Sequence, residues 1–285
     1  MIRNFAMLYD QLCEDIKQAP IVQTKRWQGV TIEGNEHMAQ REMTHVHIDI
    51  LMYGEELELY AHDTGAEIPW CDDHFEERVS GYPMNPGTEW RNWSQTKAYR
   101  GGVDSFLDER GKFNHNYMER YWPKFAGQVK RPTDSAQDWR RAFSDQTLDV
   151  STGGQFRPIP NRGIMYEYGQ LIDVVDLLAD DPYTRQAYFP VWFPEDTGGG
   201  SKRAPCTIGY HFLMRDDRLD VNYHIRSCDL YKHFRNDVYL TIRLLLWVLD
   251  RVRSRNPQWA QVRPGRFLMQ IGSLHLFKPD WSKIQ

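Results

Sequence analysis

The sequence predicts an α+β fold in which a largely antiparallel β-sheet packs against helices. Three observations support this: a segment of helical spacing that ends at a proline, two runs of alternating apolar residues around a short turn, and a long apolar stretch. With 285 residues, of which 41% are hydrophobic, the chain is long enough to bury one large core. We therefore treat residues 1–285 as a single domain.

The first well-patterned element is a helix that begins near residue 171. Leu171, Val174, Val175 and Leu178 recur at the spacing of one helix face. Pro182 follows two acidic residues and marks the end of the pattern. The pattern is typical of a surface helix followed by a tight turn.

The second element is a β-hairpin that runs from Cys206 to Arg226. Apolar residues alternate over residues 208–214 and again over residues 219–225. Asp216-Asp217 lies between the two runs and is suited to a two-residue turn. The hairpin therefore predicts that Arg226 returns to the side of Cys206.

The third element is a long helix from Asn236 to about Arg253. Its sequence is almost wholly apolar, and it starts with residues that commonly cap helices. These features indicate a helix buried against the sheet.

Charge and hydropathy exclude two classes of partner. The net charge is −4, so the composition offers no excess of basic residues for a nucleic acid. The longest apolar run, residues 244–249, is far shorter than a membrane span, and the N-terminus has no signal-peptide pattern. We therefore expect no membrane or nucleic-acid partner, and a location in the cytoplasm of a bacterium or of the host of a virus.

The four cysteines are scattered, without a CxxC pair or a His/Cys cluster at zinc spacing. We expect neither disulfides nor a metal. Cys206 differs from the others because it stands after a loop and directly before a strand, where its thiol could face a pocket. Taken alone, the same position also suits a small buried hydrophobic residue.

The segment at the far end of the hairpin is Arg226-Ser227-Cys228-Asp229. An arginine beside Cys206 would favour the thiolate and could also bind a phosphate, with the Ser227 hydroxyl as an additional donor. The residues alone allow a second interpretation, in which Arg226 forms a salt bridge with a surface carboxylate.

Several motifs, taken together, resemble the thymidylate synthase family. The block formed by Pro205-Cys206, the hairpin and Arg226–Asp229, continued by Phe234–Asp237, is similar to the family's signature in order and spacing. Three further segments resemble family motifs: Asn114–Tyr117, Asp181–Arg185 and Gly272–Phe277. The resemblance covers residues 114–285 as a recognisable catalytic core and leaves residues 1–113 as a divergent N-terminal part.

The resemblance implies a fold, a partner and a cofactor. It implies a thymidylate synthase-like fold that forms a homodimer through its sheet, with a phosphate site shared between subunits. It implies 5,10-methylenetetrahydrofolate as the one-carbon donor and a pyrimidine nucleotide monophosphate as the substrate. Cys206 is then the nucleophile that adds to C6 of the ring, which makes C5 nucleophilic.

Asp237 indicates which base is bound. In thymidylate synthases an asparagine at the position eleven residues after the Arg226 equivalent pairs with uracil, and here that position is Asp237. A carboxyl group suits cytosine, because it accepts from the C4 amino group and, when protonated, donates to N3. Deoxycytidylate hydroxymethylases carry Asp in a similar Arg-Asn-Asp run. A helix-capping role for Asp237 or Asn236 is the structural alternative.

The resemblance also implies roles in proton transfer. A glutamate on an upstream helix organises solvent around the base, and Glu76 and Glu77 are the two candidates. Tyr117 is the candidate for assisting removal of the C5 proton. The alternatives are a solvated Glu-Glu pair and an aromatic core residue.

The phosphate, the sugar and the folate have their own candidates. Arg226, Ser227, a partner's Arg185 and Arg26 would hold the phosphate, although Arg26 could equally be a solvated surface residue. Asn236 is a further substrate-binding candidate, and Asp229 is the cofactor-binding one. His275 would bond the sugar 3′-hydroxyl, unless it is a core histidine.

Two departures from the family pattern bear on these roles. Phe277 stands where the family has a tyrosine, so one sugar contact is expected to be lost. The chain also stops soon after that motif, at residue 285, without the tail that closes over folate. We expect the segment 83–93, rich in Pro, Gly and Trp, as a substitute cover.

Several reactions remain open from the sequence. Water can complete the reaction to give 5-hydroxymethyl-deoxycytidylate, whereas a hydride from the folate gives a 5-methyl product on deoxycytidylate or deoxyuridylate. We favour the hydroxymethyl product because the Asp-bearing relatives are hydroxymethylases. The alternatives are a methyltransferase, an inactive nucleotide- or RNA-binding relative, and a cysteine hydrolase, for which no local motif supplies a histidine and its orienting partner.

Overall fold

A computed structural model of the chain describes residues 4–27, 30–95, 103–109, 111–113, 115–123, 170–193, 196–197 and 203–284. The helices are α1 (Phe5–Lys17), α2 (Leu57–Thr64), α3 (Trp70–Val79), α4 (Tyr117–Tyr121), α7 (Leu171–Asp180) and α8 (Phe234–Arg255). The short 3-10 helices are η1 (Glu36–Met38), η2 (Glu89–Arg91), η4 (Val103–Phe106), η8 (Pro257–Trp259) and η9 (Lys278–Lys283).

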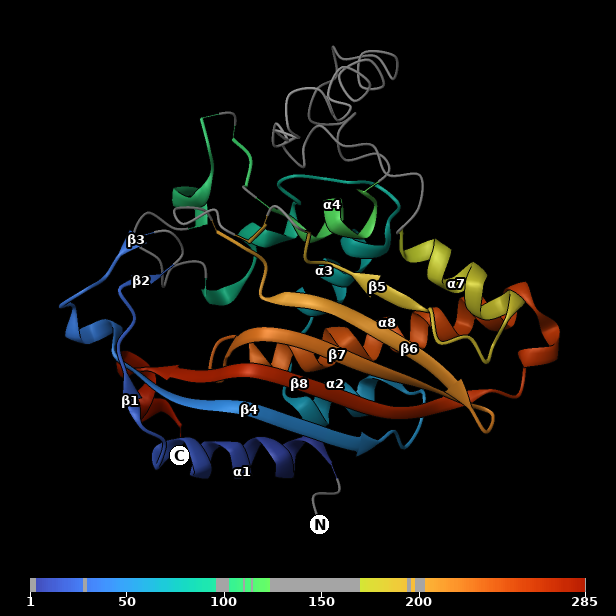
Figure 1. Cartoon of the computed structure of the whole chain (residues 1–285), viewed down its shortest axis with the longest axis horizontal. Helices are drawn as coiled ribbons and strands as arrows, with labels where there is room; N and C mark the ends of the chain where they lie inside the picture. Colours follow the sequence, from blue (N-terminus) through green and yellow to red (C-terminus); the bar gives the residue numbers. More distant parts are fainter. Residues whose placement is uncertain are drawn as a thin grey trace, which may run out of the picture.

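A six-stranded sheet forms the centre of the molecule (Figure 1). Its strands follow the order β1-β4-β8-β7-β6-β5, and β2 and β3 form a separate pair. The strands are β1 (Ile21–Val22), β2 (Arg26–Trp27), β3 (Val30–Thr31), β4 (Gln40–Leu51), β5 (Tyr188–Pro190), β6 (Thr207–Arg215), β7 (Arg218–Asp229) and β8 (Arg263–Phe277). Neighbouring strands run antiparallel except for β7 and β8, so the predicted α+β class with a largely antiparallel sheet is confirmed.

The predicted hairpin is the pair β6 and β7. Asp216 and Asp217 both have positive φ, 48° and 56°, which is the conformation that a two-residue hairpin turn requires. Alternate residues of β7, from Leu219 to Ile225, are buried. The alternation seen in the sequence therefore corresponds to one face of the sheet turned into the core.

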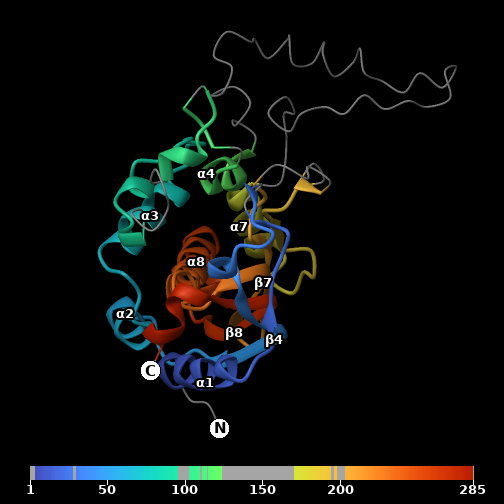
Figure 2. The same cartoon turned by 90° about the vertical axis from the view of Figure 1, so that its left-hand side faces the viewer.

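Helix α8 connects the two parallel strands β7 and β8, as a parallel pair requires. Figure 2 shows α8 lying between the sheet on one side and α2 and α3 on the other. Twelve of its residues are buried, from Phe234 to Val252. The predicted buried helix is confirmed, but it begins two residues before Asn236. Helix α7, also predicted, packs along α8.

The parallel register of β7 and β8 positions the candidate site. Ser227 pairs with Ser273, and Asp229 pairs with His275, so two motifs separated in sequence lie side by side. This close pairing requires Gly272, because a Cβ there would lie 2.8 Å from the carbonyl oxygen of Arg226. Within the described part of the chain, no helix is both long and apolar enough to cross a membrane.

Candidate active site

Cys206 lies immediately before β6, after the buried Pro205, and is partly buried. The backbone N–H of Arg226 donates to the Cys206 carbonyl oxygen at 2.9 Å, so the hairpin brings the two residues together as predicted. Burial raises the pKa of the Cys206 thiol, and the charge of Asp237 acts in the same direction. The guanidinium groups of Arg226 and Arg203 oppose this rise because they stabilise the thiolate.

The Arg226 side chain fixes the loop before Cys206. Its Nε donates to the Pro205 carbonyl oxygen at 2.9 Å, and its Nη2 donates to the Ala204 carbonyl oxygen at 3.0 Å. These acceptors are backbone oxygens of the cysteine loop rather than the surface carboxylate of the alternative interpretation. The side chain is exposed, so the guanidinium can reach an anion from solvent while it holds the loop.

Ser227 and His275 meet across the parallel strands. The Ser227 Oγ lies 3.5 Å from His275 Nδ1, and His275 is 8% exposed. Burial lowers the pKa of His275, against the opposing effect of the Asp229 carboxylate. His275 is therefore a neutral ring that can donate from one nitrogen and accept at the other.

Asp237 lies inside the first turn of α8. Its N–H donates to the His233 carbonyl oxygen at 2.8 Å, and the N-cap position is occupied by His233. Its carboxylate Oδ2 lies 3.6 Å from Cys228 Sγ. Burial raises the pKa of Asp237, while the charges of His233 and Arg78 lower it. Asp237 therefore does not cap the helix. Its carboxylate lies beside Cys228, and its charge acts on the Cys206 thiol.

Asn236 does not cap α8 either. Its Oδ1 accepts a hydrogen bond from the backbone N–H of Glu67 at 3.0 Å, and the side chain is buried. The bond joins the link between α2 and α3 to the start of α8. The capping alternative is therefore wrong for both residues of the Asn-Asp pair.

Tyr117 is the first residue of α4, and its hydroxyl lies next to the start of β6, the strand that follows Cys206. The Thr207 hydroxyl donates to the Tyr117 hydroxyl at 3.3 Å and lies 2.9 Å from the Tyr223 hydroxyl. Burial raises the pKa of Tyr117 to about 12, and the negative charges of Cys206 and Asp237 contribute to that rise. Asn114, which opens this motif, lies outside the described residues.

Glu76 and Glu77 lie on the same helix, α3, but have different surroundings. Glu76 is 68% exposed at its side chain and pairs with Arg243 Nη2 at 2.7 Å. Glu77 is 11% exposed, and its Oε1 accepts from the backbone N–H groups of Thr88 and Glu89. Only Glu77 therefore has its carboxylate turned into the protein.

The structure adds two residues that the motif analysis did not select, His74 and Arg78. Arg78 Nε donates to His74 Nε2 at 3.0 Å, and the Arg78 guanidinium carbon lies 4.4 Å from the centre of the Tyr117 ring. Both residues are buried, at 8% and 6% exposure. Their spacing was the available signal, since Cys71, His74, Phe75 and Arg78 follow the 3-1-3 pattern of a buried helix face.

Asp229 stabilises the turn between β7 and α8. Its Oδ1 accepts from the backbone N–H groups of Tyr231 and Lys232, each at 3.0 Å. Its other oxygen, Oδ2, lies 3.9 Å from Lys232 Nζ, which makes a closer pair with Asp280 at 2.8 Å. Oδ2 therefore retains capacity to accept a hydrogen bond from an N–H group such as a pterin carries.

The remaining two phosphate candidates lie on other elements. Arg185 is exposed in the segment before the edge strand β5, where its backbone carbonyl lies 3.1 Å from His211 Nε2. Arg26 is exposed on β2. The ring of the adjacent Trp27 lies 6.2 Å from that of Phe277, so the β2–β3 pair lies beside the end of β8 that carries His275.

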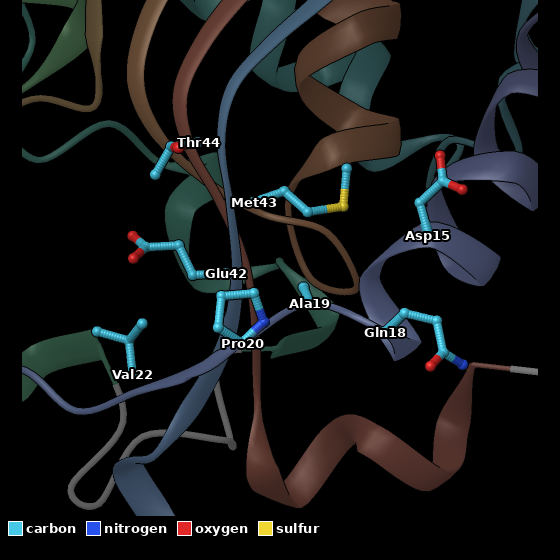
Figure 3. A pocket seen from close by; sticks show the side chains of 8 residues that line it. All are labelled: Asp15, Gln18, Ala19, Pro20, Val22, Glu42, Met43 and Thr44. Atoms are coloured by element: carbon cyan, nitrogen blue, oxygen red, sulfur yellow. The ribbon is translucent and has the colours of Figure 1, made fainter.

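The expected cover, residues 83–93, packs near the start of α8. The rings of Trp93 and His233 stack at 4.7 Å, and Trp93 also contacts Trp70 at 5.9 Å. An open depression lies between the end of α1 and β4 and is lined partly by Asp15, Gln18 and Glu42 (Figure 3). None of its lining residues is a candidate site residue of the region around Cys206. Among the described residues, no group of three His, Cys, Asp or Glu side chains could hold a metal ion.

Comparison with known proteins gives a consistent result. The Thymidylate synthase family profile matches residues 9–285, which includes the part upstream of the motifs. A protein of Methanococcoides burtonii, provisionally named a thymidylate synthase, is 25% identical over 63% of this chain and 70% of its own length. A similarly named protein of Methanosarcina mazei is 23% identical over 69% of this chain and 84% of its own length. The deoxyuridylate hydroxymethyltransferase of Bacillus phage SP01 is 27% identical over 42% of this chain, and the match spans 30% of that protein.

Proposed function

The chain belongs to the thymidylate synthase family, and on this basis we propose that it transfers a one-carbon unit to C5 of deoxycytidylate to give 5-hydroxymethyl-deoxycytidylate. The observation that carries the choice of base is Asp237. It lies at the start of a buried helix, close to Cys228 Sγ, and its charge acts on the Cys206 thiol. A carboxyl group in this position matches the amino group and N3 of cytosine.

Cys206 is the proposed nucleophile. Its thiolate would add to C6 and make C5 electron-rich enough to attack a one-carbon donor. The resting thiol has a raised pKa, so Arg226 and Arg203 are needed to offset the cost of burying the thiolate. The loop that carries Cys206 is held by the same Arg226, so this side chain contributes to both the charge and the position of the nucleophile.

The nucleotide phosphate is assigned to Arg226 and Ser227, with Arg185 of a second copy of the chain and Arg26 as further cations. The sugar is assigned to His275, whose neutral ring lies beside the Ser227 hydroxyl. In this arrangement β7 and β8 hold the phosphate and sugar, and the start of α8 holds the base. Asn236 supports the base site by fixing the link between α2 and α3.

Tyr117 is the proposed group for the C5 proton. With a pKa of about 12 it is a neutral phenol at physiological pH, and its oxygen accepts from Thr207. In the proposed step its oxygen accepts the C5 proton while its own O–H proton passes to solvent water, so the phenol need not first become an anion. Asp229, through Oδ2, is the proposed folate contact. When bound, 5,10-methylenetetrahydrofolate supplies the one-carbon unit.

A second candidate is 5-hydroxymethylation of deoxyuridylate. It is favoured by the name of the phage relative, which acts on that nucleotide. A carboxyl group that carries a proton can pair with uracil as well as with cytosine, and burial raises the pKa of Asp237. The protonation state of Asp237 therefore bears directly on the choice between the two.

Product analysis tests the proposal. The purified protein is incubated with 5,10-methylenetetrahydrofolate and with deoxycytidylate, cytidylate or deoxyuridylate, and the nucleotides are identified by mass spectrometry. The proposal predicts a hydroxymethyl gain on deoxycytidylate. A methyl gain would overturn the reaction, and exclusive turnover of deoxyuridylate would overturn the base. A C206A variant should give no product with any nucleotide.

A further inference from the structure

The start of β6 departs from the regular alternation of a strand. Counting back in steps of two from the buried Tyr210 places Ile208 on the inner face of the sheet and Thr207 on the outer one. The structure shows the reverse, since Ile208 is 38% exposed and Thr207 is 2% exposed. The register with β7 shifts between Thr207 and Gly209, where β6 has one residue more than its partner. This irregularity turns the Thr207 side chain into the core.

Inside the core, the Thr207 hydroxyl lies between two tyrosine hydroxyls. It donates to the Tyr117 oxygen at 3.3 Å and lies 2.9 Å from the Tyr223 oxygen. A threonine hydroxyl has one proton, so Tyr223 must be the donor in the second bond. Tyr223 is 1% exposed, and a buried hydroxyl of this kind needs an acceptor. The three groups therefore form a directional chain of hydrogen bonds from Tyr223 through Thr207 to Tyr117.

The inner end of this chain is held by packing. The ring of Tyr223 stacks on that of Tyr210, with centroids 4.8 Å apart and an interplanar angle of 15°. The Tyr121 hydroxyl donates to the Tyr210 hydroxyl at 3.4 Å, which joins α4 to β6. Because α4 also carries Tyr117, both ends of the chain are tied to the same part of the sheet.

The outer end of the chain is Tyr117, which is only partly buried. Its ring is held from α3, where the Arg78 guanidinium carbon lies 4.4 Å from the ring centre. Its oxygen accepts from Thr207, so its own proton cannot be directed at Thr207, and no described residue accepts that proton. The ring and the oxygen are therefore fixed by the protein, while the O–H proton is left for water or a ligand.

We infer that Thr207, oriented by Tyr223, is a positioning residue for removal of the C5 proton. The inference rests on the proposed function, in which Tyr117 receives that proton. In this step the C5–H bond breaks and its electron pair stays on the substrate, the Tyr117 oxygen gains the proton, and the O–H proton of Tyr117 passes to water. The bond from Thr207 holds the oxygen in place for this exchange and stabilises negative charge that develops on it.

The test compares variants of the chain in the full-length protein. T207V keeps the shape of the side chain but removes the hydroxyl, and should slow tritium release from C5 of deoxycytidylate by about tenfold. T207S keeps the hydroxyl and should recover most of the rate. Y223F removes only the group that orients Thr207 and should slow release by a smaller factor, about threefold. A T207V protein that releases tritium at the wild-type rate would overturn the inference.

An isotope effect distinguishes positioning from a loss of folded protein. With deuterium at C5, T207V should show a larger isotope effect on kcat than wild type, because removal of the C5 proton limits a greater part of its rate. Partial unfolding would lower the rate and leave the isotope effect unchanged. A slower T207V protein with the wild-type isotope effect would therefore contradict the inference.

A direct titration separates this inference from the proposed function. With 3-fluorotyrosine in place of Tyr117, ionisation of the phenol is followed by 19F NMR. Donation from Thr207 favours the phenolate, so the pKa of this phenol should be higher in T207V than in the labelled wild type, and T207S should match the wild type. If the unlabelled wild-type protein makes no hydroxymethyl nucleotide but T207V raises that pKa, the proposed function fails and the contact with Thr207 stands. If product forms but the titrations coincide, the role of Thr207 fails alone.

Discussion

The two sides of the candidate site are built in different ways. On the strand side, Cys206, Arg226 and Ser227 belong to one hairpin, and its backbone hydrogen bonds determine how they face each other. On the helix side, Tyr117 and Arg78 come from α4 and α3, which meet where the Arg78 guanidinium packs on the Tyr117 ring and where Trp122 Nε1 donates to the Arg78 carbonyl oxygen. The strand side is therefore set by local register, whereas the helix side depends on packing between distant parts of the chain.

The largest expected effect comes from replacing the nucleophile on the strand side. Cys206→Ser keeps the size of the side chain but replaces the thiolate with a weak nucleophile, so kcat should fall by at least about a thousandfold. The measurement is the rate of product formation with a saturating nucleotide. Because the change is isosteric, nucleotide affinity measured by equilibrium dialysis should stay close to wild type. A C206S protein with substantial turnover would rule out Cys206 as the nucleophile.

The next largest effect comes from replacing Asp237, the residue proposed to select the base. Asp237→Asn supplies one donor and one acceptor in place of a carboxyl group, which matches uracil. The ratio of kcat/KM for deoxycytidylate to that for deoxyuridylate should fall by about a hundredfold. Competition between the two nucleotides in one reaction gives this ratio directly. An unchanged preference would show that another residue reads the base.

A smaller effect is expected on the helix side, where Glu77 and Glu76 of α3 are compared. Glu77→Gln removes the carboxylate that is turned into the protein and should reduce kcat/KM by about tenfold, whereas Glu76→Gln breaks an exposed ion pair and should change it less than about twofold. The two variants are matched because they alter neighbouring residues of the same helix in the same way. If E76Q were the more damaging substitution, the orientation of α3 towards the site would have to be revised.

The smallest expected effect concerns stability. The pKa of Asp237 is raised in the folded protein, so the folded state binds more protons than the unfolded state between the two pKa values. Stability therefore falls as the pH rises from the unfolded pKa through the folded one, and the ionised carboxylate is a cost at neutral pH.

Removing that cost should make D237N more stable than wild type at neutral pH. The difference should shrink as the pH is lowered below the folded pKa of Asp237. Urea unfolding at several pH values measures this difference. A D237N protein that is less stable at neutral pH and gains relative stability in acid would contradict the sign of the argument.

The sequence predicted the strand side well for a physical reason. The alternation in β6 and β7 and the two aspartates of the turn are local, and they place Arg226 beside Cys206 without knowledge of the rest of the chain. The long apolar stretch predicted α8 in the same way. The pattern does not show that Phe234 and Arg235 belong to the helix, so the capping alternative for Asn236 and Asp237 could not be excluded from the sequence.

The helix side could not be predicted to the same extent. The bond from Glu67 to Asn236 joins residues 169 positions apart, and the contact of Arg78 with Tyr117 joins two helices whose relative position the sequence does not specify. The choice between Glu76 and Glu77 also depends on which face of α3 is buried. The periodicity of Cys71, His74, Phe75 and Arg78 indicates the buried face of α3, but it does not by itself identify which carboxylate serves the site.

The most direct test of the central claim is release of tritium from C5 of deoxycytidylate by the wild-type protein in the presence of 5,10-methylenetetrahydrofolate. The account predicts rapid release that depends on the folate and on Cys206, with much slower release from labelled deoxyuridylate. Release from deoxyuridylate alone, or no release from either nucleotide, would contradict the claim that this site activates C5 of a cytosine nucleotide.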